Sequence, residues 1–448
     1  MNSTYRNRDI SEQVRAIHSG EITISELSSA VRTDITRYED RLKAWVALAD
    51  MSVPFPPSSP EVDDSAGARP LEGVSIGVKD IIDVAGLPTR SGSAVTSALS
   101  AEADAACVAR FRELGAVIQG KTVTTEFGYF SPGLTVNPWD HECTPGGSSS
   151  GSAAAVGANT IALALGTQTA GSLTRPASFC GAAGMVLAAG STPMAGVNGM
   201  SETLDSLGMI TRTVADLAYV YSAFAGQDVD RPEDSAASGM KLHIWHGSEV
   251  LPLAPQMQDL LREVPRIAAD IGVDHKDLDW NDHVVTLTAD HRTVMGYEAA
   301  RTLAGVQAEH EAELSPQLLE LLRGGAEIQD QDYREALIRR DISRRALERL
   351  LGPDGVIIGP AAQGPALNRC NGTGSPDLSR AWQLLGLPVV VVPGARSTTG
   401  MPLGLQLIGL PGSEQRLLTL GQLLEKRLRR LPSFSEHTSQ PTLKDLTW

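Results

Sequence analysis

Short apolar runs alternate with amphipathic helical patterns through the middle of the chain. From Leu71 onward, the predicted elements are a strand at 74–82, a helix at 105–114, a strand at 116–120, a helix at 150–157 and a strand at 161–166. Alternation of this kind is typical of a largely parallel sheet covered by helices. We therefore predict an α/β fold whose central sheet is mixed but mostly parallel, with helices on both faces.

A more charged and more helical segment, about residues 250–352, interrupts this pattern before it resumes. A helical pattern at 414–430 closes the chain, and continuous apolar runs typical of buried strands lie at 356–360, 389–393 and 403–408. Strands on both sides of the helical segment look equally buried. The pattern therefore predicts a single domain over residues 1–448 with a helical insertion, rather than two separate folds.

The first 50 residues contain two helical patterns, at 9–18 and 25–48. The second starts close to a pair that resembles a capping box, either Thr23–Glu26 or Ser25–Ser28. A stretch rich in proline, serine and aspartate follows at 54–70. We predict a surface loop there, ahead of the core.

Composition and charge narrow the class of protein. Hydrophobic residues make up 42% of the 448 residues and charged residues 20%, which is ordinary for a globular enzyme. The formal net charge of −15 would repel nucleic acid phosphates and anionic membrane surfaces, so neither is expected as a partner. The start of the sequence has no apolar signal core, and no segment approaches the roughly 20 apolar residues of a membrane helix. We therefore expect a cytoplasmic protein.

The four cysteines, Cys107, Cys143, Cys180 and Cys370, lie far apart in the sequence. They lack the paired spacing of a zinc site or of a disulfide framework. This distribution fits a reducing compartment, and we expect neither a metal nor another cofactor.

The most unusual stretch, residues 144–176, is rich in serine, threonine and small residues. A serine follows glycine near each of its ends, at Ser148 and Ser172, and a predicted helix and strand lie between them. A helix of about nine residues advances roughly 14 Å, and a strand of about seven residues returns roughly 20 Å. The two serines can therefore meet in space.

A serine is a poor nucleophile unless a base lies within reach. The nearest histidine, His141, belongs to a predicted turn, and the others are scattered, so we set the histidines aside. Lys79 is the alternative base. Three apolar residues, Val74, Ile76 and Val78, lie on the opposite face of its strand, and its neighbours on its own face are small. Burial there would lower the pKa of Lys79 and leave a neutral amine near pH 7, whereas a lysine at a strand end could instead reach water.

Together these features resemble the amidase signature family, most densely over residues 71–216, the expected signature core. The family's glycine pair followed by serines appears at 146–152 as GGSSSGS, and its later Gly-Thr-(Asp or Gln)-Thr-Gly-Gly-Ser appears at 166–172 as GTQTAGS. Lys79, in a Val-Lys-Asp strand, matches the family's catalytic lysine. Further matches lie at 179–181, 204–205 and 212–216.

The resemblance implies an amidase that converts a small-molecule carboxamide to a carboxylate and ammonia or an amine through an acyl-enzyme. Ser172 would attack the carbonyl, and neutral Lys79 would take the proton through Ser148. A cis peptide bond would precede Ser148. The oxyanion hole would consist of backbone N–H groups, those of Thr169, Ala170, Gly171 and Ser172.

Three positions depart from the family pattern. Ala170 replaces the first glycine of a pair, which is tolerable if its φ is negative. The family commonly has arginine two residues after the nucleophile, but here Thr174 stands there and Arg175 follows, as in a malonamidase-like subset. Arg175 is a candidate for binding a substrate carboxylate by bidentate hydrogen bonds, and the alternative is a structural arginine tied to a loop carbonyl. The family's Gly-Leu-Lys-Pro is altered at 184–187.

The identity of the amide stays open at this stage. The acyl pocket is expected in the loop 127–134 and in the helical segment after residue 290. A second copy of the chain in a homodimer is a further candidate partner.

Three other interpretations compete with this one. Residues 115–122, GAVIQGKT, match the pattern of a P-loop nucleotide hydrolase, but they follow a helix and look like a strand, with Gly115 as a helix C-cap. Residues 147–151 match a nucleophile elbow centred on Ser149, yet no buried strand precedes them. The third is a catalytically dead binding subunit, or an amidotransferase subunit that delivers ammonia to a partner; the complete set of Lys79, Ser148 and Ser172 argues against a dead site but not against a partner.

Overall fold

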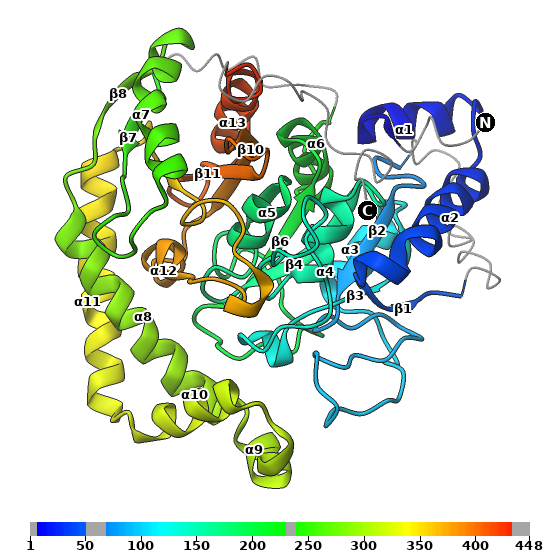
Figure 1. Ribbon diagram of the computed structural model, residues 1–448, viewed down its shortest axis with the longest axis horizontal. Helices are drawn as coiled ribbons and strands as arrows, with labels where there is room; N and C mark the ends of the chain where they lie inside the picture. The colour runs from blue at the N-terminus through cyan, green and yellow to red at the C-terminus, as the bar shows by residue number, and fades with distance from the viewer. Residues whose placement is uncertain (1–6, 51–68, 230–238, 432–448) are drawn as a thin grey trace.

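The computed structural model describes residues 7–50, 69–229 and 239–431. In these residues eleven strands form one sheet, in the order β1-β3-β2-β4-β6-β5-β10-β11-β9-β7-β8 (Figure 1). The strands are β1 (Trp45–Leu48), β2 (Ser75–Lys79), β3 (Val117–Thr122), β4 (Leu163–Gln168), β5 (Ala183–Val186), β6 (Ser206–Thr211), β7 (Lys241–Ile244), β8 (Asp274–Asp277), β9 (Gly355–Pro360), β10 (Val389–Arg396) and β11 (Pro402–Ile408).

Helices cover both faces of the sheet, as the packing of β10 demonstrates. They are α1 (Ile10–His18), α2 (Ile24–Leu42), α3 (Ala106–Glu113), α4 (Ser150–Gly157), α5 (Thr174–Cys180), α6 (Val214–Phe224), α7 (Pro255–Asp270), α8 (Asn281–Thr302), α9 (Ala304–His310), α10 (Pro316–Glu327), α11 (Asp330–Leu351), α12 (Asp377–Leu384) and α13 (Glu414–Leu428). Val391 packs with Ala177 of α5, whereas Val390 and Val392 border Gly421 of α13. Because successive side chains of a strand point to opposite faces, α5 and α13 lie on opposite faces.

The α/β class and the mixed sheet flanked by helices are confirmed, but parallel pairs are fewer than predicted. Among the described strands, four neighbouring pairs are parallel and six are antiparallel. The connection between β10 and β11, residues 397–401, is too short for the crossover that parallel neighbours need. Apolar runs identified these strands as buried, but burial does not encode their direction.

The N-terminal helical pattern ends earlier than predicted. The capping box of Thr23 and Glu26 is present, but α2 stops at Leu42 and β1 pairs antiparallel with β3. Lys43 adopts a left-handed conformation with φ 54°, and the Glu39 carboxylate accepts the backbone N–H of Trp45 at 2.9 Å. These contacts turn the chain into the sheet edge. Most of the predicted loop at 54–70 lies outside the described residues.

The segment 250–352 consists mostly of helices α7 to α11, as predicted, but it also contributes the edge strand β8, which pairs parallel with β7. The two long helices α8 and α11 lie side by side at one end of the sheet, and α10 packs against α8 (Figure 1). In the described parts of the chain no helix is both long and apolar enough to cross a membrane.

The P-loop interpretation of residues 115–122 is wrong. Gly115 follows the C-terminal end of α3 and has a φ of 97°. Residues Val117–Thr122 form the buried strand β3 instead of a loop. The Nζ of Lys121 lies 2.9 Å from the Asp80 carboxylate, and both side chains are fully buried. A lysine held this way has no access to a phosphate.

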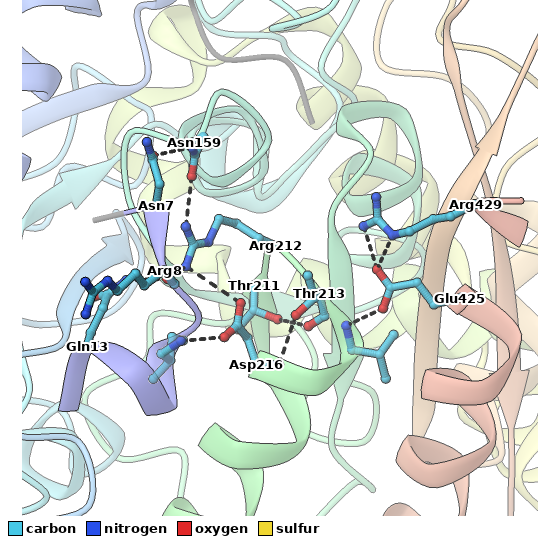
Figure 2. Close-up of polar contacts among 12 residues, drawn as sticks. Asn7, Arg8, Gln13, Asn159, Thr211, Arg212, Thr213, Asp216, Glu425 and Arg429 are labelled. Atoms are coloured by element: carbon cyan, nitrogen blue, oxygen red, sulfur yellow. Dashed lines mark hydrogen bonds and ion pairs between the residues drawn. The ribbon is translucent and has the colours of Figure 1, made fainter. Parts of the chain in front are cut away.

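A buried polar cluster fastens the N-terminal helix α1 to α6. Asp216, near the start of α6, accepts the backbone N–H of Ile10 at 2.6 Å. Figure 2 shows Asp216 among the polar residues of this cluster. Arg212 lies 3.8 Å from the same carboxylate, and its guanidinium also bonds Asn159 at 3.1 Å and the carbonyl of Arg8. The cluster therefore ties chain segments that are about 200 residues apart in the sequence to one another.

Replacing Asp216 with alanine should lower the free energy of unfolding by roughly 3 kcal/mol, because it leaves Arg212 and the Ile10 N–H without their buried partner. Urea denaturation followed by circular dichroism measures this change. Asp40, exposed on α2, offers a control, and Asp40→Ala should stay within about 0.5 kcal/mol of the native chain. Equal effects of the two substitutions would contradict the role of the cluster.

Candidate active site

Strand β2 carries Lys79 into a fully buried position between two hydroxyl groups. Its Nζ lies 2.7 Å from Ser148 Oγ and 2.7 Å from Thr167 Oγ1. Burial lowers the pKa of Lys79 to about 7, and the negative charge of Asp205 only partly offsets this effect. A large fraction of neutral amine is therefore available at neutral pH, as predicted, and the alternative of a lysine reaching water is wrong.

The segment before α4 places Ser148 against this amine. The Gly147–Ser148 peptide bond is cis, as the family resemblance implied. A Cβ on Gly147 would come within 2.9 Å of Thr373 and 3.0 Å of Thr125, so glycine is required at this point of close packing. Ser149 Oγ donates to the carbonyl of Thr167, which supports the site and leaves no role for Ser149 as an elbow nucleophile.

The two ends of the serine-rich stretch meet, as predicted. The backbone N–H of Ser149 donates to the carbonyl of Ser172 at 3.0 Å, and Ser148 and Ser172 line the same cavity. The structure contains a hydrogen bond between Lys79 and Ser148, but none between the hydroxyls of the two described serines. Ser172 is 8% exposed, so its hydroxyl is accessible only through the cavity.

The loop from Thr169 to Ser172 presents unpaired backbone donors. None of its four N–H groups donates to another residue in the described part of the chain. The Gln168 side chain accepts the N–H groups of Leu173 and Thr174, both at 3.0 Å, and so holds the turn that follows the nucleophile candidate. Ala170 has no positive φ, which is the condition under which alanine is tolerated there.

Thr169 is held on two sides. Its hydroxyl donates to Asp205 at 2.5 Å, and its carbonyl lies 2.8 Å from Nε2 of His291 on α8. Asp205 also accepts the backbone N–H groups of Met200 and Ser201. Burial nevertheless raises the pKa of Asp205 above its ordinary value.

The contacts of Arg175 have features of both roles considered for it, a structural arginine and a ligand for a substrate carboxylate. Its Nε donates to the carbonyl of Thr373 at 2.7 Å, and its NH2 donates to the carbonyl of Gly147 at 2.6 Å, as a structural arginine would. Its NH1, however, is buried without a partner, and the residue lines the cavity. Burial, together with the nearby Arg380, lowers the pKa of Arg175 to about 9, so the side chain stays cationic near neutral pH.

The cavity beside the serines is small and opens to solvent. Three of its polar atoms are buried without a hydrogen-bond partner, namely Arg175 NH1, Thr125 Oγ1 and Thr373 Oγ1. Both regions predicted for the acyl pocket contribute apolar lining, the loop 127–134 through Gly128, Tyr129 and Phe130 and helix α8 through Met295. Ala170, Met200 and Pro376, from outside these regions, line it as well.

Sequence reasoning missed several groups that shape the site. The family motifs contain three of them, Thr167, Gln168 and Asp205. The motifs do not show which atoms these side chains contact. His291 was set aside with the other histidines. No local pattern connects it to residues more than 100 positions earlier, so only the packing of α8 could have identified it.

The sheet topology defines the chain as an α/β protein, and a buried lysine, Lys79, is hydrogen-bonded to Ser148 beside its cavity. A family model described as Amidase matches residues 57–418, and the chain belongs to the amidase family. One similar protein is a glutamyl-tRNA(Gln) amidotransferase subunit of Oleidesulfovibrio alaskensis. It is 31% identical over 479 residues, which cover 94% of this chain and 98% of the relative.

Two solved structures extend the comparison. A crystal structure of an amidase is 26% identical, with a TM-score of 0.82, and the match covers 94% of this chain and 100% of that one. The peptide amidase of Stenotrophomonas maltophilia is 25% identical with a TM-score of 0.78, over 97% of this chain and 100% of that one. Family membership and these neighbours make the chain a hydrolase of amide C–N bonds.

The pKa of Lys79 provides a test of whether this residue is the base in amide hydrolysis. Because only the neutral amine can accept a proton, kcat/KM should fall roughly tenfold per pH unit below about pH 7 and level off above it. Initial rates on one small amide between about pH 5 and 9 measure this profile. A profile whose midpoint lies near about pH 10 would show that Lys79 titrates like an exposed lysine.

Proposed function

We propose that this chain hydrolyses a small-molecule carboxamide through an acyl-enzyme on Ser172. The hydrogen bond between the buried Lys79 amine and the Ser148 hydroxyl carries the proposal. As Ser172 Oγ attacks the amide carbonyl, its proton passes to Ser148 and the Ser148 proton passes to neutral Lys79. Ser148 then donates a proton to the leaving nitrogen and regains one from Lys79, and the C–N bond breaks. Water attacks the ester with the same relay as base, and a proton returns to Ser172 as the carboxylate leaves.

The loop 169–172 supports the second requirement of this chemistry, which is stabilisation of the developing oxyanion. Its backbone N–H groups have no acceptor in the described residues, and three of its residues, Thr169, Ala170 and Ser172, line the cavity. A single such donor is worth roughly 2.7–4 kcal/mol in the transition state. The proposed reaction uses no metal or other cofactor.

A panel of small amides tests the proposal through ammonia release by the native chain and by Ser172→Ala. We expect release by the native chain and a loss of at least about 10³-fold in the variant, because the residual site would lack its nucleophile. Circular dichroism confirms that the variant is folded. Equal release by both proteins would refute the proposal.

We further propose that the substrate carries a carboxylate close to its amide, as in a malonamidase-like subset. A cationic guanidinium, that of Arg175, is buried at the cavity, and no carboxylate of a described residue lies within ion-pair distance of it. The free hydroxyls of Thr125 and Thr373 line the same cavity. Buried polar atoms without partners are costly, and the carboxylate of a bound substrate would offer acceptors to such donors.

Two amides of similar size test whether Arg175 binds a substrate carboxylate or has only a structural role. Succinamic acid carries a carboxylate where butyramide carries a methyl group. Arg175→Leu should raise the KM for succinamic acid by roughly tenfold or more and leave that for butyramide within about twofold. Thr373→Val is the gentler test, since it removes the free hydroxyl and keeps the carbonyl that holds Arg175. Equal KM changes for both amides in both variants would end the idea.

Ammonia delivery within an amidotransferase is the second candidate function, and the relative from Oleidesulfovibrio alaskensis, a glutamyl-tRNA(Gln) amidotransferase subunit, favours it. In that role the chain would pass ammonia to a protein partner. It would then show little ammonia release from small amides on its own, and partner proteins would be needed for full turnover. Size-exclusion chromatography of the isolated chain tests the homodimer that an independent amidase would be free to form.

A further inference from the structure

His291 links the helical insertion to the candidate oxyanion loop. It lies on α8, is fully buried, and does not line the cavity. Its Nε2 lies 2.8 Å from the carbonyl oxygen of Thr169, and its Nδ1 lies 2.8 Å from NH1 of Arg380 on α12. With both ring nitrogens occupied and no access to the cavity, His291 cannot exchange a proton with a substrate.

The neighbours of His291 determine its tautomer. A guanidinium can only donate, so Nδ1 must accept from Arg380, and the ring proton must reside on Nε2, which donates to the Thr169 carbonyl. Burial, reinforced by the charge of Arg380, holds the pKa of His291 well below its usual range. The imidazole is therefore a neutral and directional donor throughout the pH range in which Lys79 titrates.

Fixing the carbonyl of Thr169 also fixes the next N–H group. In a trans peptide the C=O and N–H bonds point in opposite directions within one plane. The carbonyl of Thr169 points toward α8, so the N–H of Ala170 points away from it. This N–H is one of the donors without an acceptor among the described residues, and Ala170 lines the cavity.

We propose that His291 is a positioning residue of the oxyanion hole, and this inference rests on the proposed function. Its Nε2–H holds the Thr169–Ala170 peptide plane so that the Ala170 N–H is aimed at the oxygen of the reacting carbonyl. The bond to the carbonyl also polarises the peptide and strengthens that N–H as a donor. The hydrogen bond from Thr169 Oγ1 to Asp205 holds the other side of the same residue.

Arg380, which donates to the imidazole, is itself held by charged neighbours. Arg380 Nε donates to Asp377 at 2.8 Å, and the other oxygen of Asp377 lies 2.9 Å from Arg292 on α8. Helix α8 therefore supports the site through two residues. His291 bonds the Thr169 carbonyl directly, and Arg292 pairs with the carboxylate that holds Arg380. Loss of the imidazole would free the peptide plane and would also leave Arg380 NH1 without this acceptor.

The test compares His291→Phe with His291→Gln, because glutamine offers a donor and an acceptor and phenylalanine offers neither. In His291→Phe, kcat for butyramide should fall roughly 10- to 100-fold while KM stays within about twofold, since a misaimed donor weakens transition-state binding more than substrate binding. In His291→Gln, kcat should stay within about fivefold of the native value. If phenylalanine prevents folding, His291→Met repeats the measurement.

Propylboronic acid supplies a readout that a merely structural role would not change. Its boronate matches the butyryl group and places an oxygen where the oxyanion forms, so its Ki should rise in His291→Phe by a factor similar to the loss of kcat. His283→Phe is the matched control, because His283 also lies on α8, bonds Ser343 at 2.9 Å and stacks on Trp280. That variant should keep native kcat and Ki.

The outcomes separate this inference from the proposed function. An inactive native chain would refute the amidase proposal and the positioning role that rests on it. An active native chain, abolished by Ser172→Ala, with unchanged kcat in His291→Phe would refute the positioning role alone. A Ki for propylboronic acid that does not follow kcat would refute it as well.

Discussion

The burial of a single amine is the constraint on which the rest of this structure depends. Lys79 has no exposed surface, and its desolvation brings its pKa to about 7. Burial disfavours the charged ammonium there relative to a lysine in water, because no carboxylate of a described residue is in contact with it. The surroundings instead offer two hydroxyls, those of Ser148 and Thr167, which suit a neutral amine. The proposed role of Lys79 as a base depends on these two uncharged neighbours.

The sheet explains how such neighbours come together. Strand β2 pairs parallel with β4, so Lys79 and Thr167 lie near the same end of adjacent strands. Helix α4 runs back from Ser148 to β4, which leads directly into the loop 169–172. A short local segment therefore supplies the relay candidate, the nucleophile candidate and the backbone donors. The long-range partners Asp205 and His291 then orient that segment from outside.

Charge is distributed unevenly between the molecule and its cavity. The chain as a whole carries a formal net charge of −15, yet Arg175 and Arg380 both line the cavity. Arg380 is paired with Asp377, whereas Arg175 is held by backbone carbonyls. A local cationic site in an acidic protein attracts small anions while the outer surface repels polyanions. The charge of the cavity thus agrees with the proposed substrate that carries a carboxylate.

The sequence by itself determined part of the sheet and the candidate reactive residues. Apolar periodicity located six of the eleven described strands, namely β2, β3, β4, β9, β10 and β11. The glycine-serine motifs pointed to Ser148 and Ser172 because few other segments combine such small residues with hydroxyls. Lys79 was recognisable from its apolar strand, since local alternation encodes which face is buried. The direction of the central strands, the end of α2 at Leu42 and the edge strand β8 were beyond these patterns, because they depend on pairing partners far away in the chain.

Tertiary structure alone decided how the site is held. His291, Asp205 and the carbonyl contacts of Arg175 connect segments separated by up to about 200 residues, and a hydrogen bond between such segments leaves no periodic trace in either of them. The sequence could therefore indicate which side chains carry the chemical groups that the proposed reaction needs. Only the packing of α8 and α12 against the serine-rich loop decided which atoms those groups contact, because contact depends on distance in space and not on spacing along the chain.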